Sequence, residues 1–436
     1  MKISLYIPCF NSEKTIAACL DSVLLQEFPL DSILVVDDGS TDKSAEIAAK
    51  YPVKIIRHNK NRGLACARNT ALKAINSEFV ASLDADCVAR PDWLKQLTKG
   101  LKSPLVAGSG GRLLETQASS VFDLWRSVHM KQDWQDLNAQ PPFLFGSNTV
   151  FRRQVLIDCG LYNEEFKSNY EDVDICNRLK NNGYTISYRP EACVEHRKKD
   201  SLYSLFNSFW RWNFEFYLRQ DYYSSEDKLV FKLNDNLGLA NRFLEEDKKS
   251  KKSGLFYLDF LLAVHHSLKD FEYYISHVNP KQFENQGLYF WLSLLDLTLF
   301  CHLHPAKVPL KSIVPENNKI IQNFLALNLV LGQQIRESFK DEKIQRIIYK
   351  HLLFSLYGTN DPYLLDKIFN LVLLHKDWSG LYYRNHPHLE QAFLKNLFFY
   401  FRKWMRERIS NSDELIKSIE ISAKMTDKAI GECHEN

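Results

Sequence analysis

Two hydrophobic patterns alternate along residues 1 to about 115. Short apolar runs, typical of buried strands, are each followed by a longer segment in which apolar residues recur every three or four positions, as on an amphipathic helix. This repeated strand–helix order predicts an α/β fold with a mainly parallel sheet, helices on both faces and ligands at the carboxyl ends of the strands. Strands are predicted at residues 3–8, 32–38, 53–58 and 79–86, and helices at 12–26, 40–51, 64–75 and 91–101.

The pattern changes near residue 224. A helical segment follows, then the charged stretch EEDKKSKKSG at 245–254, and from Leu255 onward nearly every segment has helical periodicity. We therefore predict an α/β domain over residues 1–224 and an all-helical domain over residues 225–436, with few contacts crossing the charged stretch. The lack of a recognisable fixed-period repeat favours an irregular bundle over a regular solenoid.

Composition narrows the class of protein. A chain of 436 residues, 45% hydrophobic and 25% charged, is typical of a globular protein with about two or three domains. The net charge of +3 gives no reason to expect a nucleic-acid partner. Nine scattered cysteines without a Cys-x-x-Cys pair predict reduced core thiols and a cytoplasmic location. The longest apolar stretches, 255–264 and 287–300, each contain an Asp and are too short to predict a transmembrane helix; peripheral membrane association stays open.

Acidic residues end two of the predicted strands. Asp84 and Asp86 stand one residue apart after an apolar run, so in extended chain they point to the same side and repel each other unless a cation lies between them. The alternative is a polar turn before Pro91, which starts the next helix. Asp37 and Asp38 end another strand, where a carboxylate could accept a nucleobase ring N–H or instead form an Asx turn and helix cap.

Basic residues follow the third predicted strand. Gly63 stands at a turn into a helix, and Arg62 and Arg68 lie near the helix start. This arrangement could cradle a diphosphate, but Arg68 on a solvated helix face is an equally good interpretation.

Six motifs, taken together, resemble the inverting family-2 glycosyltransferases with a GT-A fold. Their order and spacing match across roughly residues 1 to 200, whereas residues 225–436 are not covered. They are YIPCFNSEKTIAACLDSVLLQ, VVDDGSTDKS, NRGLACARNTAL, SLDADCVARPDWL, GSNTVFRRQVLIDCGLYNEEF and YEDVDICNRLKNNGYTISYRPEACVEH. The resemblance implies transfer of a sugar from a nucleoside-diphosphate donor, with a UDP-sugar favoured, to an acceptor hydroxyl with inversion, using Mn²⁺ or Mg²⁺.

The resemblance also implies roles for individual residues. Asp38 would contact the nucleobase, which Pro8 and Phe10 would flank. Asp84 would lie on the nucleotide side of the metal motif, and Asp86 would be the direct metal ligand. One or two carboxylates suffice for such an ion, because it keeps water and phosphate oxygens in its shell.

The later motifs contain further candidate site residues. Asp172 resembles the family's general base, although an acidic residue at a helix start also has a capping role. His196 is a further metal ligand or a histidine packed in a turn beneath the next helix. Ser147, Asn148 and Glu171 are expected near the donor sugar and acceptor. Asp174 is expected to be structural or to pair with Arg178, and Trp210 or Trp212 to pack in a core rather than on sugar faces.

Two other functions are compatible with parts of this pattern. Nucleotidyltransferases also combine such a sheet with metal-binding carboxylates, but the first motif lacks their Gly-rich phosphate loop. A catalytically inactive GT-A domain acting as a scaffold is the remaining alternative. The helical domain is expected to recognise a bulky glycan or protein acceptor, or to form a homo-oligomer.

Overall fold

The computed structural model describes residues 1–115, 120–134, 140–166, 169–252, 255–278, 319–338 and 340. The chain divides into two compact units, Met1–Asp200 and Ser201–Asn436.

A seven-stranded sheet forms the centre of the first unit, in the order β3-β2-β1-β4-β8-β6-β9. β1 pairs in parallel with β2 and β4, whereas β8 runs antiparallel to β4 and β6. The predicted mainly parallel sheet is confirmed, and the reversed β8 is an addition. The strands are β1 (Ile3–Cys9), β2 (Ser32–Asp37), β3 (Lys54–Arg57), β4 (Phe79–Leu83), β6 (Val106–Gly110), β8 (Asn148–Arg152) and β9 (Thr185–Tyr188).

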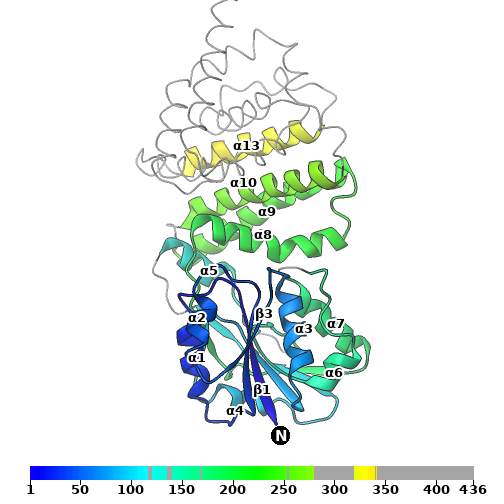
Figure 1. The fold of residues 1–436 in the computed structure, drawn as a ribbon. Coiled ribbons are helices and arrows are strands. Elements are labelled where there is room, and N and C mark those ends of the chain that lie inside the picture. The colour runs from blue at the N-terminus through cyan, green and yellow to red at the C-terminus, as the bar shows by residue number, and fades with distance from the viewer. Residues whose placement is uncertain are drawn as a thin grey trace, which may run out of the picture. The chain divides into compact units, whose positions relative to one another are not determined.

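Helices cover both faces of this sheet (Figure 1). One face carries α1 (Ile16–Leu24), α2 (Ser44–Ala48) and α4 (Trp93–Thr98), and the other carries α3 (Leu64–Ala74), α6 (Arg153–Asp158) and α7 (Glu171–Asn181). Every residue of β1 is buried as a result. The free thiols of Cys9, Cys19, Cys66, Cys87, Cys176 and Cys193 are buried, as predicted for core cysteines.

A small second sheet is built from three short, distant strands. β10 (Val194–His196) lies between β5 (Cys87–Ala89), to which it is antiparallel, and β7 (Leu113–Glu115), to which it is parallel. α5 (Val121–His129) follows β7 in the chain and begins at a capping box formed by Ser120 and Asp123. This sheet joins the segment after β4 to the end of the first unit.

The described part of the second unit is helical. It contains α8 (Leu202–Arg219), α9 (Glu226–Lys249), α10 (Phe256–Tyr273), the π-helical turn η2 (Tyr274–Val278) and α13 (Lys319–Ser338). α9 packs against both α10 and α13. Among the described residues, no helix is long and apolar enough to cross a membrane. The apolar stretch 287–300 lies outside the described residues.

The division between the units falls after Asp200, before the predicted domain boundary at 224/225. α8 belongs to the helical unit because the carboxylate of Asp270 on α10 accepts hydrogen bonds from Trp210 Nε1 at 2.8 Å and from Tyr223 Oη at 2.6 Å. Asn236 on α9 donates to the same carboxylate at 2.8 Å. The aromatic helix α8 therefore packs against α9 and α10, and Trp210 is half-buried there.

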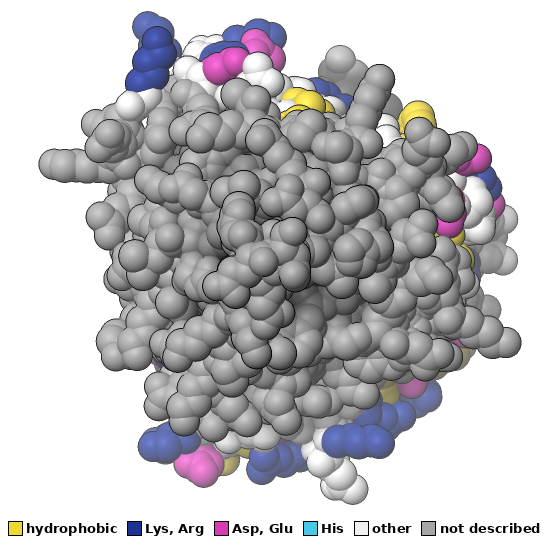
Figure 2. Space-filling view, turned by 90° about the horizontal axis from the view of Figure 1, so that it is seen from above, with side chains coloured by type: hydrophobic (Ala, Val, Ile, Leu, Met, Phe, Trp, Pro, Cys, Tyr) yellow, Lys and Arg dark blue, Asp and Glu magenta, His cyan; other side chains and the backbone are white. Residues whose placement is uncertain are grey.

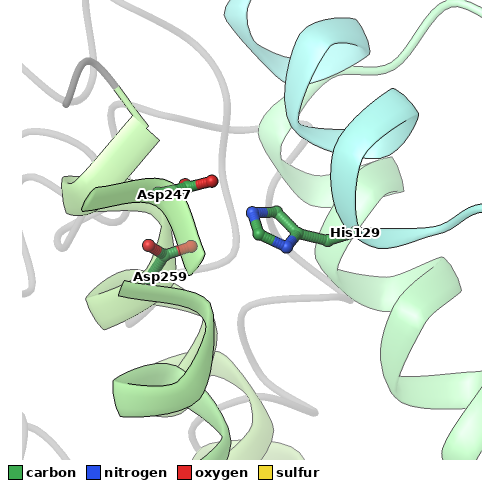
Figure 3. A group of neighbouring side chains, drawn as sticks. All are labelled: His129, Asp247 and Asp259. Atoms are coloured by element: carbon green, nitrogen blue, oxygen red, sulfur yellow. The ribbon is translucent and has the colours of Figure 1, made fainter. Parts of the chain in front are cut away.

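The described part of the charged stretch, residues 245–252, forms the end of α9 and its cap rather than a free linker. Lys251 is left-handed, with φ of 56°, and the N–H of Lys252 donates to the carbonyl of Asp247 at 2.8 Å, a Schellman-type helix end. The buried carboxylates of Asp247 and of Asp259 on α10 lie within 4.8 Å of each other (Figure 3). Figure 2 shows Lys and Arg side chains beside Asp and Glu among the described residues of one face, in keeping with the near balance of charge.

The position of the boundary can be tested by truncation. A fragment ending at Asp200 should be soluble and show cooperative unfolding, because the first unit has cores on both faces of its sheet. A fragment ending at Lys252 keeps α8 and α9 without α10, and should bind a hydrophobic dye and aggregate as Leu229 and Leu233 become exposed. Size-exclusion chromatography and dye binding measure this, and a monodisperse longer fragment beside an aggregated shorter one would contradict the boundary.

Candidate active site

The carboxyl ends of β1 and β2 lie side by side. Cys9 and Asp37 are paired residues, and the N–H of Asp38 donates to the carbonyl of Cys9 at 2.8 Å. Pro8 is buried in β1, whereas Phe10, the first residue after the strand, is 46% exposed. An accessible aromatic ring therefore stands beside the two acidic residues of β2.

Asp38 and Asp37 have different surroundings. Asp37 accepts from the N–H of Ser40 at 3.0 Å and lies 2.9 Å from Arg57 Nε, so Asp37 is the residue that forms the turn. Asp38 instead accepts hydrogen bonds from the loop after β3.

The Asp38 carboxylate holds that loop in place. It accepts from the N–H of Arg62 at 2.9 Å and of Gly63 at 2.8 Å, and Oδ1 lies 2.6 Å from Nδ1 of His58, a residue that sequence reasoning missed. A carboxylate has about four acceptor positions, so these three bonds leave one for a further N–H. Helix capping does not explain Asp38. The expected nucleobase contact stays a prediction.

Asp84 and Asp86 follow β4 and have different partners. Asp84 Oδ1 lies 3.2 Å from Nη2 of Arg68, and Asp86 Oδ2 lies 3.3 Å from Nε2 of His196. The side chains are 28% and 33% exposed, respectively. The N–H of Cys87 also donates to the Asp84 carbonyl at 3.0 Å, so the pair does occupy a turn, but one that leaves both carboxylates accessible.

His196 ends β10 between two acidic groups. Its Nδ1 lies 2.7 Å from Oε1 of Glu115, a second residue that sequence reasoning missed, and its Nε2 faces Asp86. Burial alone would lower the pKa of His196, but Asp86 and then Glu115 raise it to about 9. In turn, His196 lowers the pKa of Asp86 against the effect of burial. A histidine simply packed in a turn does not describe this geometry.

Arg68 is buried at the centre of the site. Its side chain is 1% exposed, and Nη1 donates to Ser82 Oγ at 2.6 Å and to the carbonyl of Gly146 at 2.7 Å. Besides Asp84, it pairs with Glu171, whose Oε1 lies 3.4 Å from Nε. The solvated-face interpretation is therefore wrong. A direct diphosphate contact is also not supported, because the guanidinium is surrounded by protein partners.

Asp172 lies next to this cluster, in the first turn of α7. Its Oδ2 accepts from the N–H of Gly146 at 3.1 Å, and its Oδ1 from that of Val173 at 2.8 Å. The residue at the N-cap is Tyr170, which is left-handed with φ of 78° and makes no side-chain cap. Burial raises the pKa of Asp172, although the Gly146 N–H and Arg68 oppose this. A raised pKa makes a carboxylate a stronger base.

Two residues expected near the donor sugar and acceptor are buried. Asn148 is fully buried: its Oδ1 accepts from Trp93 Nε1 at 2.7 Å, and its Nδ2 donates to the carbonyls of Arg112 at 3.0 Å and Ala192 at 2.9 Å. These bonds connect segments of the two sheets, and the expected place of Asn148 near the donor sugar stays a prediction. Glu171 is 2% exposed and faces Arg68; burial and the neighbouring Asp172 raise its pKa to about 7.

Two other residues of this region, Ser147 and Asp174, lie close to the cluster in the chain. The Ser147 carbonyl accepts from the N–H of Asp84 at 3.4 Å, so Ser147 lies beside the metal motif. Asp174 pairs with Arg178 at 2.7 Å, which confirms the expected ion pair and separates Asp174 from the site.

The N-terminal unit is similar to proteins of a known family. Residues 4–160 match the family described as Glycosyl transferase family 2. This match lies within the N-terminal unit, whose sheet and helices form a GT-A fold.

Curated relatives match part of the chain. A pre-mycofactocin glycosyltransferase of Mycobacterium tuberculosis (strain ATCC 25618 / H37Rv) is 29% identical over 180 residues, 39% of this chain and 38% of that protein. A poly-beta-1,6-N-acetyl-D-glucosamine synthase of Staphylococcus epidermidis is 27% identical over 222 residues, 48% of this chain and 53% of that protein. The chain thus spans about half the length of these relatives or less.

A solved structure, the mannosyltransferase PcManGT from Pyrobaculum calidifontis in complex with GDP-mannose and Mn²⁺, aligns with 90% of this chain and 85% of its own at 14% identity, with a TM-score of 0.39.

The central position of Arg68 predicts a large effect on stability. Arg68→Ala leaves Asp84 and Glu171 without their shared cation, and should lower the free energy of unfolding by about 3–5 kcal/mol. The matched control is Arg62→Ala, since Arg62 is 51% exposed and its ion pair with Glu164 is long, at 3.8 Å. That change should cost less than about 1 kcal/mol. Urea denaturation of both variants measures the difference, and equal losses would contradict the central role of Arg68.

Proposed function

We propose that the N-terminal domain is a metal-dependent inverting glycosyltransferase that moves a sugar from a nucleoside-diphosphate sugar, with a UDP-sugar favoured, to a hydroxyl of a glycan or protein. The observation that carries the proposal is the chain of contacts from Asp84 through Arg68 and Gly146 to Asp172. It brings the metal motif and the candidate base to one edge of the sheet. The glycosyltransferase names of the curated relatives support the same activity.

The donor atoms at Asp86 and His196 fit a divalent ion. A carboxylate oxygen and an imidazole nitrogen 3.3 Å apart suit Mn²⁺, whereas Mg²⁺ prefers oxygen ligands alone. Asp86 is also 33% exposed, so its carboxylate can be reached from solvent. We assign these two residues to an ion that, when bound, neutralises the charge developing on the diphosphate leaving group.

The nucleotide is assigned to the ends of β1 and β2. Asp38 has one acceptor position left for a ring N–H such as N3–H of uracil, and the exposed ring of Phe10, two residues after Pro8, can pack against the base. Asp84 directly follows β4, the strand beside β1, whereas Asp86 lies two residues further along. We therefore assign Asp84 to the nucleotide side of the diphosphate.

Asp172 is assigned as the general base. It takes the proton of the acceptor hydroxyl while the hydroxyl oxygen forms its bond to the anomeric carbon and the bond to the diphosphate breaks on the opposite face. Ser147 follows Gly146 in the loop before β8, and this loop bonds to both Asp172 and Asp84. The donor sugar is expected there. Glu171 keeps Arg68 in place, so its role is positioning.

The helical unit is assigned to acceptor recognition or to homo-oligomerisation. The buried free thiols fit the predicted cytoplasmic location. An inactive scaffold is the alternative function, and it predicts no metal-dependent binding of donor.

A donor panel separates these functions. UDP-glucose, UDP-galactose, UDP-N-acetylglucosamine and GDP-mannose are each incubated with the full chain in Mn²⁺, in Mg²⁺ and in EDTA, and release of nucleoside diphosphate is measured. The proposal predicts that at least one donor is hydrolysed with metal and not in EDTA. No metal-dependent binding or hydrolysis of any donor would favour the scaffold.

Replacing Asp86 tests the metal assignment. Asp86→Ala should abolish transfer and the Mn²⁺-dependent part of UDP binding, because the diphosphate loses its bridge, while uridine binding stays unchanged. Asp92→Ala is the control, since Asp92 lies in the same stretch and bonds to Gln96 on α4. Calorimetric titrations with UDP and with uridine measure both effects. Full Mn²⁺-dependent binding in the Asp86 variant would exclude this residue as a ligand.

Replacing Asp172 tests the base. Asp172→Asn should slow transfer by about 10²–10⁴-fold, while UDP and Mn²⁺ affinities stay close to those of the wild type. An amide oxygen can keep only one of the bonds from Gly146 and Val173, so the melting temperature is measured on the same preparation. Asp174→Asn is the control on the same helical turn. If Asp172 only supported the helix, Asn would serve as well, and transfer would remain near normal.

A further inference from the structure

The small sheet places Glu115, His196 and Asp86 in line. Glu115 and His196 are paired residues of the parallel strands β7 and β10, so their side chains leave the same face of the sheet. His196 is also paired with Cys87 of β5, and the N–H of Arg197 donates to the carbonyl of Asp86 at 2.8 Å. The strand register and this hydrogen bond therefore place the imidazole of His196 between the carboxylates of Glu115 and Asp86, which come from distant parts of the chain.

The two carboxylates contact opposite nitrogens of the ring. Oε1 of Glu115 lies 2.7 Å from Nδ1, and Oδ2 of Asp86 lies 3.3 Å from Nε2. The Glu115 side chain is 14% exposed and that of Asp86 is 33% exposed, so the Nε2 side is the more accessible one. An ionised carboxylate only accepts hydrogen bonds, so the short contact requires the proton on Nδ1.

We propose that Glu115 is a positioning residue that holds His196 as the Nδ1–H tautomer and directs Nε2 towards the ion bound by Asp86. Metal-binding histidines commonly donate their second N–H to a carboxylate, which fixes the ring and strengthens the ligand nitrogen. Glu115 does not itself reach the ion, because its carboxylate faces the nitrogen on the other side of the ring. This inference rests on the proposed function, which places an ion at Asp86 and His196.

The test is Mn²⁺ affinity, measured by electron paramagnetic resonance of free Mn²⁺ during titration of the full chain in saturating UDP. Glu115→Gln should weaken Mn²⁺ binding by about 10- to 100-fold, the usual loss when such a partner is removed. The matched control is Glu195→Gln on the same strand, because Glu195 pairs with Arg197 and not with His196. That variant should bind Mn²⁺ as the wild type does.

A double-mutant cycle tells a positioning role from an independent one. If Glu115 acts only through His196, then Glu115→Gln added to His196→Ala should weaken Mn²⁺ binding no further than His196→Ala alone. Additive losses would make Glu115 a separate ligand or a structural residue and would overturn the inference. Wild-type affinity in Glu115→Gln would overturn it as well.

The same titrations separate this inference from the proposed function. If Asp86→Ala abolishes Mn²⁺ binding while His196→Ala leaves it unchanged, the role of Glu115 fails and the metal-dependent transferase stands. If neither change affects Mn²⁺ binding, the metal assignment itself fails.

Discussion

The guanidinium of Arg68 lies against Asp84 and Glu171, two carboxylates from distant parts of the chain that repel each other. Leaving such charges unpaired and partly buried would be costly, and Arg68 compensates both. It also binds the carbonyl of Gly146, whose N–H bonds Asp172, so one buried cation fixes the distance between the metal motif and the candidate base. The carboxylate of Asp86 faces the imidazole of His196, and we assign the proposed divalent ion to this pair.

Strand direction explains how these side chains meet. Parallel strands β1, β2 and β4 bring Phe10, Asp38 and Asp84 to one edge of the sheet. β8 is antiparallel to β4, with Leu83 paired to Asn148, so the loop before β8 begins where β4 ends. The chain then passes from β4 of the main sheet to β5 of the small one, and the carboxylates of Asp84 and Asp86 lie at this passage. The junction between the two sheets thus brings the proposed metal ligands Asp86 and His196 together.

Local patterns predicted one part of this structure well. The four predicted strands and four predicted helices of the first hundred residues are present, because their periodicity is a local property. The acidic residues at the strand ends do lie at the candidate site. Features set by long-range pairing could not be predicted: the reversed β8, the small sheet, and with it the contact of Glu115 with His196. The burial of Arg68 and Asn148 likewise depends on partners far along the chain, and α8 joins the helical unit through a contact with Asp270.

The central claim is that Asp86 and His196 hold a divalent ion beside a nucleotide bound at Asp38 and Phe10. Its most direct test is the anomalous diffraction of Mn²⁺ in crystals of the full chain grown with UDP. We expect one strong anomalous peak within coordination distance, about 2.0–2.3 Å, of an Asp86 carboxylate oxygen and of Nε2 of His196, with diphosphate oxygens bound to the same ion. UDP bound elsewhere, or Mn²⁺ absent from these two side chains at saturating concentration, would contradict it.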